Sequence, residues 1–266
     1  MNIPASQASR IAAGRPRGFT LVELMIAITV SVFLIGGLLW MVQSTRNTFA
    51  AQNQLAQLQD NERLVMTFMT EVIESTGYFP NPQLYTNAAV LPIAGVFAAP
   101  GQAVFGTYNA AAPGDSVTIR YGAAFNDNNL FNCRGTTNTA LNPYDTFVNT
   151  FWVNNANPNN PILTCTFSSG ATPLPGVPVP LVNGVTNLSI LYGIKRNAAD
   201  TGSCADTYLN ASQMLAADWS AVCSVVVTVS FINPLYNPNG PIGPQNPQTI
   251  NLTRVVAVMN AAGVNS

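Results

Sequence analysis

The stretch of sequence that decides the fold is GRPRGFTLVELMIAITVSVFLIGGLLW, which runs from Gly14 to Trp40. Within it, an apolar run of about 24 residues, Phe19–Val42, contains one charged side chain, that of Glu23. A helix that crosses the hydrocarbon core of a bilayer needs ~20 such residues. A cleaved secretory signal has a shorter apolar region followed by a small-x-small site, and nothing after Trp40 has that pattern. The sequence therefore predicts a membrane-spanning helix.

The residues on either side of this run predict its orientation. Three arginines precede it, Arg10, Arg15 and Arg17, and a cysteine-containing, loop-rich sequence follows it. Positively charged residues stay on the cytoplasmic side of a membrane span. The amino terminus is therefore expected in the cytoplasm and the bulk of the chain outside it, as a single-pass membrane protein.

Glu23 is the unusual residue of this segment. A carboxylate inside the hydrocarbon costs roughly 2.5–3.5 kcal/mol on insertion scales. On one interpretation, Glu23 lies near the interface and reaches water. On the other, it needs a positively charged partner, and the best one, an amino terminus, comes close only if the chain is cut.

The motif RGFTLVEL resembles the processing site of type IV pilins and related pseudopilins. The resemblance implies that a membrane-bound prepilin peptidase cleaves after Gly18 and methylates the new first residue, Phe19. Glu23 then becomes the fifth residue of the mature chain and pairs with the amino-terminal nitrogen of a neighbouring subunit during assembly. A shielded pair of this kind gains more Coulomb energy than one in water, because the effective dielectric constant is lower.

The helix departs from the pattern of major pilins in one respect. Those proteins usually carry a proline midway through it, whereas here no proline occurs between Pro16 and Pro80. Gly36 and Gly37 form the only flexible point, and glycine is tolerated in membrane helices. This difference favours a minor component over the main fibre subunit.

Beyond Val42 the sequence turns polar but keeps a helical period. Gly77 and Pro80 are typical of a helix end, so one helix is predicted over Phe19–Thr76. A coiled-coil seam and a core face both fit its apolar stripe. We favour the core face, because the stripe covers few heptads and a β-rich region follows. The stripe consists of Leu55, Leu58, Val65, Phe68, Met69 and Val72.

After Pro80, short strand-like runs alternate with clusters of Pro, Gly and Asn. Alternation in the run from Val185 predicts a half-buried antiparallel strand, and the more continuous apolar run before Ile232 predicts a central one. The six clearest runs are Ser116–Gly122, Asp145–Val153, Ile162–Phe167, Val185–Lys195, Cys223–Ile232 and Gln248–Met259.

Two proline-rich segments lie between these runs. Pro173–Leu181 fits a rigid connection between strands better than a polyproline ligand. Asn233–Gln248 separates two strong strands and is predicted to be a long hairpin loop, with a surface that could contact a partner.

Composition excludes several classes of function. The net charge is −1 and only 8% of residues are charged, so there is no electrostatic footprint for nucleic acid. The chain contains no histidine, which removes Ser-His-Asp and Cys-His catalysis and the commonest metal ligand. The oxygen-rich segment Asn126–Asn132 suggests calcium, but its one carboxylate, on Asp127, favours a plain loop. We predict no enzyme, no catalytic residue, no cofactor and no metal site.

Four cysteines follow the apolar segment: Cys133, Cys165, Cys204 and Cys223. An even number in an exported domain indicates two disulfides, against the alternative of four buried free thiols. Three pairings are possible. Sequential pairing closes the shortest loops and is preferred, and the polar flanks FNCRG and GSCAD argue against deep burial.

The carboxyl-terminal half resembles the PilW family of minor pilins. The resemblance lies in LVNGVTNLSILYGI, then a cysteine loop with Trp219, then an apolar strand and LTRVVAVMN. Arg254 opens the last strand as in that family, but Met259 stands before Asn260 where arginine is expected.

These observations predict an α+β, pilin-like fold, in which a long amino-terminal helix packs on an antiparallel β-sheet head. The resemblance implies a minor pilin that helps to initiate type IV pilus assembly and twitching motility, in a minor-pilin complex at the pilus tip or base. Its expected partners are other minor and major pilins, the prepilin peptidase and the inner-membrane assembly platform. The alternatives are a minor pseudopilin of type II secretion, a tip-displayed adhesin and, least favoured, a membrane-anchored enzyme. The expected segments are a leader peptide at 1–18, a transmembrane assembly half of the helix at 19–42, a periplasmic half at 43–77 and a β-rich head at 78–266.

Overall fold

The computed structural model describes residues 18–139, 142–170, 176–197, 204–241 and 243–258 of the 266-residue chain. The predicted leader, apart from Gly18, and the Met259-Asn260 pair lie outside the described residues. The chain divides into two compact units, Met1–Gln52 and Asn53–Ser266.

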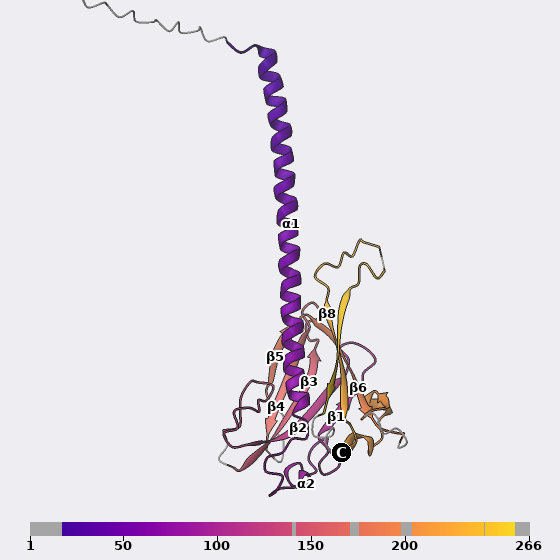
Figure 1. Cartoon of the computed structure of the whole chain (residues 1–266). Coiled ribbons are helices and arrows are strands. Elements are labelled where there is room, and N and C mark those ends of the chain that lie inside the picture. Colours follow the sequence, from indigo (N-terminus) through magenta and orange to yellow (C-terminus); the bar gives the residue numbers. More distant parts are fainter. Residues whose placement is uncertain (1–17, 140–141, 171–175, 198–203, 242, 259–266) are drawn as a thin grey trace, which may run out of the picture. The chain divides into compact units, whose positions relative to one another are not determined.

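The first unit contains the amino-terminal part of helix α1, Leu21–Glu74 (Figure 1). Every residue from Leu21 to Ala50 is exposed, although an 18-residue window of the helix has a mean hydropathy of 2.4. A helix that is apolar on all sides and covered by none of its own chain is typical of a membrane span. The prediction of a long, apolar amino-terminal helix is confirmed.

The bounds of α1 differ slightly from the predicted Phe19–Thr76. The helix begins at Leu21 because the Thr20 hydroxyl accepts a hydrogen bond from the Glu23 amide (3.3 Å), which makes Thr20 its capping residue. The helix ends at Glu74, and Gly77 follows with a φ of 73°, the left-handed conformation that commonly stops a helix.

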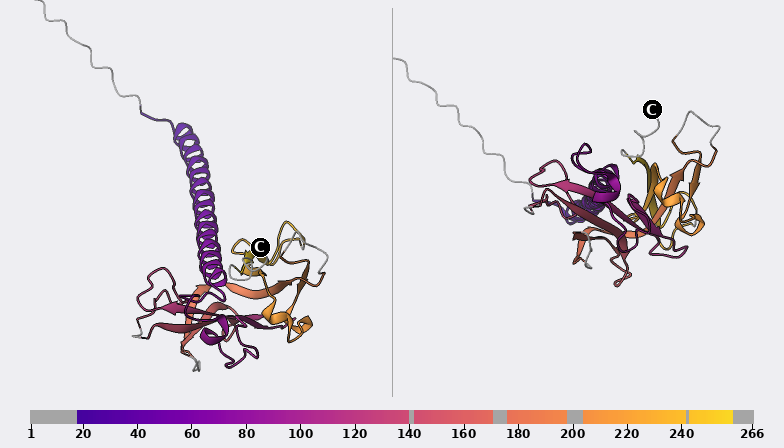
Figure 2. Two further views of the ribbon diagram at one scale, coloured as in Figure 1. Left: turned by 60° about the horizontal axis from the view of Figure 1, so that its bottom comes forward. Right: turned by 90° about the horizontal axis from the view of Figure 1, so that it is seen from below.

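The second unit contains two antiparallel sheets, which form the β-rich head (Figures 1 and 2). The first has five strands in sequence order, a simple meander. They are β1 (Val104–Thr107), β2 (Ser116–Ala124), β3 (Tyr144–Asn154), β4 (Ile162–Ser169) and β5 (Pro178–Asn183). The second sheet has four strands in the order β7-β6-β8-β9. They are β6 (Val185–Ile194), β7 (Thr207–Leu209), β8 (Ser224–Ile232) and β9 (Thr249–Ala257). The described residues of this unit also form three short helices: α2 (Asn87–Val90), η1 (Ala211–Gln213) and η2 (Asp218–Ser220).

The apolar stripe of the helix belongs to the core of this second unit, as predicted. One hydrophobic cluster joins the last turns of α1 to residues of both sheets. Phe68 is only half-buried, whereas Met66 and Ile73, which the predicted stripe omits, are buried. The buried helix residues are Leu58, Val65, Met66, Met69, Val72 and Ile73.

A buried carboxylate connects the two sheets. Asp115, 4% exposed, accepts a hydrogen bond from the Asn109 amide (2.9 Å) and another from the Ile190 amide in β6 (2.8 Å). Its own amide donates to the Leu188 carbonyl (2.7 Å). The preceding Gly114 has a φ of 91°, and a β-carbon there would lie 2.2 Å from that same carbonyl oxygen. Only glycine allows this close approach of the two backbones. The segment that contains Gly114 and Asp115 thereby covers the part of β6 that the short strand β7 leaves unpaired.

A buried cation holds the segment before β1 onto β2. Arg120 is 1% exposed and donates to the carbonyls of Gln102 (2.5 Å), Pro92 (2.5 Å) and Leu91 (3.1 Å). Its guanidinium lies 4.1 Å from the centre of the Phe97 ring. Burial lowers the pKa of Arg120 to about 10, so the side chain remains charged at neutral pH.

All six predicted strands are present, and β8 is central, between β6 and β9. The hairpin prediction for Asn233–Gln248 is confirmed, since Ile232 pairs with Thr249. One prediction is wrong in part: Pro178–Asn183 forms strand β5, not a connection. Proline is tolerated there because β5 is an edge strand, where an amide on the outer side has no ladder partner to lose.

Two disulfides join Cys133 to Cys165 and Cys204 to Cys223, with Cα–Cα distances of 6.3 and 6.1 Å. This is the sequential pairing. The argument from the polar flanks was wrong for Cys133, which is 1% exposed, whereas Cys204 is only half-buried. Their partners Cys165 and Cys223 are buried, at 0% and 5% exposed. The polar segment around Cys133 is buried because the Asn149 side chain accepts a hydrogen bond from the Cys133 amide (2.8 Å).

Candidate functional site

The predicted processing site lies just before the helix. Gly18 and Phe19 precede the first helical residue, and Phe19 is 82% exposed. No atom lies within 4 Å of the position that a Gly18 β-carbon would take. The peptide bond between the two residues is thus exposed and outside regular structure, as an enzyme that must enclose the bond requires.

Glu23 lies in the first turn of α1, three residues after its capping residue. Its side chain is exposed, and no described residue forms an ion pair with it. A negative charge in the first turn is stabilised by the amide groups of the helix start. The Thr20–Glu23 spacing is typical of a capping box, a signal in the sequence that marks the start of the helix.

The exposed surface of the helix is suited to hydrocarbon or to other helices. The two hydroxyl groups between Leu21 and Val42 do not disturb this surface, because each donates to the carbonyl four residues earlier. Thr29 donates to Met25 (2.8 Å) and Ser31 to Ala27 (2.7 Å). Polar groups satisfied within their own helix are tolerated in a bilayer. Large apolar side chains that are at least half exposed include Leu21, Val22, Leu24, Met25, Ile26, Ile28, Val30, Val32, Phe33, Leu34, Ile35, Leu38, Leu39, Trp40 and Met41.

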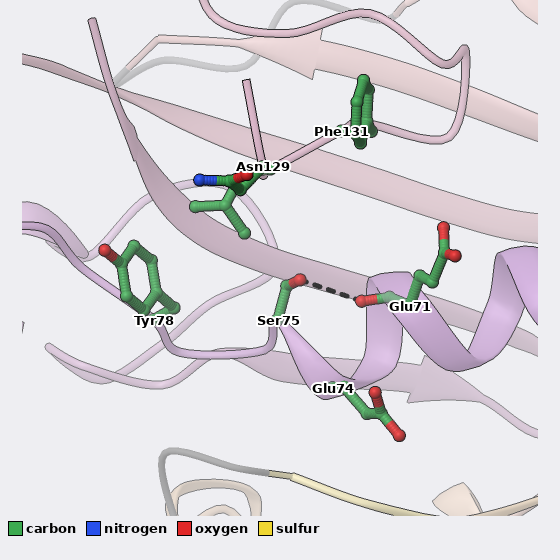
Figure 3. Close-up of a pocket in the computed structure, with 7 residues that line it drawn as sticks. Glu71, Glu74, Ser75, Tyr78, Asn129 and Phe131 are labelled. Carbon is green, nitrogen blue, oxygen red and sulfur yellow. Dashed lines mark hydrogen bonds between the residues drawn. The ribbon is translucent and has the colours of Figure 1, made fainter. Parts of the chain in front are cut away.

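A surface pocket of about 590 Å³ lies at the carboxyl end of α1 (Figure 3). Ser75 donates to the Glu71 carbonyl (2.8 Å), and the carboxylates of Glu71 and Glu74 point in different directions (Figure 3). Divergent carboxylates do not form an acid/base pair. Within the described ranges, no three His, Cys, Asp or Glu side chains are placed to share a metal ion. The pocket is lined by Glu71, Glu74, Ser75, Tyr78, Asn129, Leu130 and Phe131.

Comparisons with known proteins match two parts of the chain. Residues 14–39 match the family described as the prokaryotic N-terminal methylation motif. Residues 150–258 match the family described as type IV pilus-assembly protein W. No curated protein and no solved structure matches the chain.

The first match and the exposed apolar helix define the class: the chain is a type IV pilin-like protein with a membrane-anchoring amino-terminal helix. The second match covers the end of β3 and all of β4 to β9, including the four-stranded sheet. Together the two matches support a PilW-like type IV pilin of the minor-pilin type. Proteins of this class are structural subunits that interact with other pilins and with the machinery of pilus assembly.

Proposed function

We propose that this minor pilin helps to start type IV pilus polymerisation, as one member of a minor-pilin complex at the pilus tip or base. Its precursor enters the inner membrane with the amino terminus in the cytoplasm and the β head in the periplasm. The prepilin peptidase cleaves the Gly18–Phe19 bond and methylates Phe19. The mature helix then leaves the membrane side by side with those of other subunits.

The observation that carries this proposal is the start of α1. An exposed bond, Gly18–Phe19, lies two residues before α1, whose residues from Leu21 to Ala50 are all exposed. Glu23, in the first turn, is the only carboxylate of that exposed stretch. Cleavage would create a positive nitrogen at the same depth in the membrane as Glu23. Because a carboxylate alone there costs roughly 2.5–3.5 kcal/mol, pairing Glu23 with a neighbour's terminal nitrogen recovers energy only upon assembly. This sets the axial register between subunits, while the apolar side chains supply contact area.

The experiment that tests processing is Gly18→Ala, with Gly36→Ala as a matched control. Apart from adjacent residues of the chain and of the helix turn, no described residue has an atom within 4 Å of the added β-carbon at either position, so neither change disturbs tertiary packing. The intact mass of the membrane-extracted protein is measured for each. We expect Gly18→Ala to retain the leader of about 18 residues and Gly36→Ala to be processed normally. A normal mature mass for Gly18→Ala would refute the assignment of the cleavage site.

A further inference from the structure

The two sheets end in four edge strands, and three of these edges are blocked. Strand β5 carries Pro178 and Pro180, which have no amide to offer to a partner. Strand β7 has three residues and strand β1 has four. Proteins commonly shorten their edge strands or place proline in them, because an unprotected edge pairs with other chains.

The fourth edge, β9, has none of this protection. It has nine residues without proline, and Arg254 is its only charged residue. Its backbone groups alternate between the two sides. The Asn233 amide donates to Gln248 (2.9 Å) and the Val258 amide to Cys223 (2.8 Å), so the even-numbered residues between them bond to β8.

The odd-numbered residues therefore direct their amide and carbonyl groups away from the sheet. No residue in the described part of the chain pairs with this side of β9. The same residues are exposed and uncharged. These residues are Asn251, Thr253, Val255 and Ala257, and Val255 is 59% exposed. The charged side chains nearest to them, Arg254 and the α1 residues Glu62 and Arg63, line a surface pocket with Thr253.

We propose that this free edge of β9 docks an extended strand from the head of a different pilin-type subunit and so continues the four-stranded sheet into a neighbouring protein. Alternating free amides and carbonyls are recognised by an extended backbone. The inference rests on the proposed function for the identity of the neighbour.

The blocked edges argue against a second copy of this chain. Subunits that follow one another along a fibre make head-to-tail contacts, in which an edge meets a different edge of the next molecule. If that molecule were another copy, β9 would have to pair with β1, β5 or β7, which are short or contain proline. A different subunit with an unblocked edge satisfies β9 along its full length.

The test uses the full-length chain in detergent, mixed in turn with each other pilin-type subunit of the same strain, purified in the same way. Val255→Pro removes one outward amide and leaves the β8–β9 hydrogen bonds in place. Val255→Thr keeps that amide and is the matched control. Thermal unfolding of both variants checks that the head is intact.

We expect one subunit to bind, with Val255→Pro weakening its affinity about tenfold or more and Val255→Thr leaving it unchanged. Hydrogen exchange gives a second readout that needs no substitution. In the complex, the outward amides of β9 should exchange at least about tenfold more slowly, while those already bonded to β8 change little.

Each other outcome has a distinct meaning. Binding that is unaffected by Val255→Pro, with unchanged exchange in β9, overturns the docking edge and leaves the pilin proposal standing. Self-association through β9 overturns the choice of a different subunit as the occupant. If no pilin-type subunit binds the wild-type chain, the docking edge and the proposed minor-pilin complex both fail.

Discussion

Replacing Arg120 by methionine tests the account of how the head is held together. Methionine fills a similar volume but cannot donate hydrogen bonds. The carbonyls of Pro92 and Gln102 would then lose the donor that each has in the folded state, whereas the Leu91 carbonyl keeps the Gly101 amide (2.8 Å). A buried acceptor left without a partner costs about 1–3 kcal/mol, and the substitution also removes the cost of burying a charge.

We therefore expect Arg120→Met to lower the free energy of unfolding by about 3–5 kcal/mol. For a unit of this size, each kcal/mol corresponds to roughly 2–4 °C in Tm, so a loss on the order of 10 °C is expected. The measurement is thermal unfolding of the full chain in detergent at pH 7, followed by near-UV circular dichroism.

Arg134→Met is the matched control, because the Arg134 side chain is exposed. We expect it to change the free energy of unfolding by less than about 0.5 kcal/mol. If Arg120→Met and Arg134→Met unfold within 1–2 °C of each other, the buried guanidinium does not hold residues 91–102 on the sheet, and the reasoning is refuted.

Three further predictions concern carboxylates and tyrosines. Asp115→Asn places an amide nitrogen against one of the two backbone amides that donate hydrogen bonds to the carboxylate. We expect the free energy of unfolding, measured by chemical denaturation, to fall by about 2 kcal/mol. An unchanged denaturation midpoint would contradict the connection between the two sheets. Glu23→Ala should leave membrane insertion and cleavage intact but reduce the amount of the protein recovered in sheared pili. Glu74→Ala, which removes an exposed carboxylate of the same helix, should not reduce it. Equal recovery of the two variants would contradict the assembly role of Glu23. Burial raises the pKa of Tyr121 and of Tyr192, so the folded state keeps two protons that the unfolded state releases near pH 10, and this contribution to stability is lost as the pH rises above that value. Phenolate absorbance should show two of the eight tyrosines ionising only as the head unfolds. Reversible ionisation of all eight before unfolding would contradict the burial of Tyr121 and Tyr192.

The strands that could be predicted from sequence are those whose side chains alternate or form continuous apolar runs. The two runs that became β6 and β8 are examples, because their period reports burial directly. The helix was predictable to within two residues at each end for the same reason. The difference at its start comes from the Thr20 hydroxyl, which caps the helix and so places its first residue at Leu21.

The features that could not be predicted depend on tertiary position. Whether a proline-rich segment such as Pro178–Asn183 is a strand depends on its lying at the edge of a sheet, which local sequence does not encode. Arg120 stands in a strand-like run as an ordinary polar position, and only its carbonyl partners 18 to 29 residues earlier make it a buried cation. The same limit applies to Cys133. Its polar neighbours in sequence predict exposure, but its amide donates a hydrogen bond to the Asn149 side chain and the residue is buried.

The measurement that tests the central claim most directly is a clean deletion scored in one strain by two assays, with the wild-type gene restored as a control. One assay counts sheared surface pili and twitching, and the other measures release of a secreted enzyme. The account predicts lost pili and twitching with normal secretion. Normal pili with blocked secretion would contradict it and would move the chain to the pseudopilins of type II secretion.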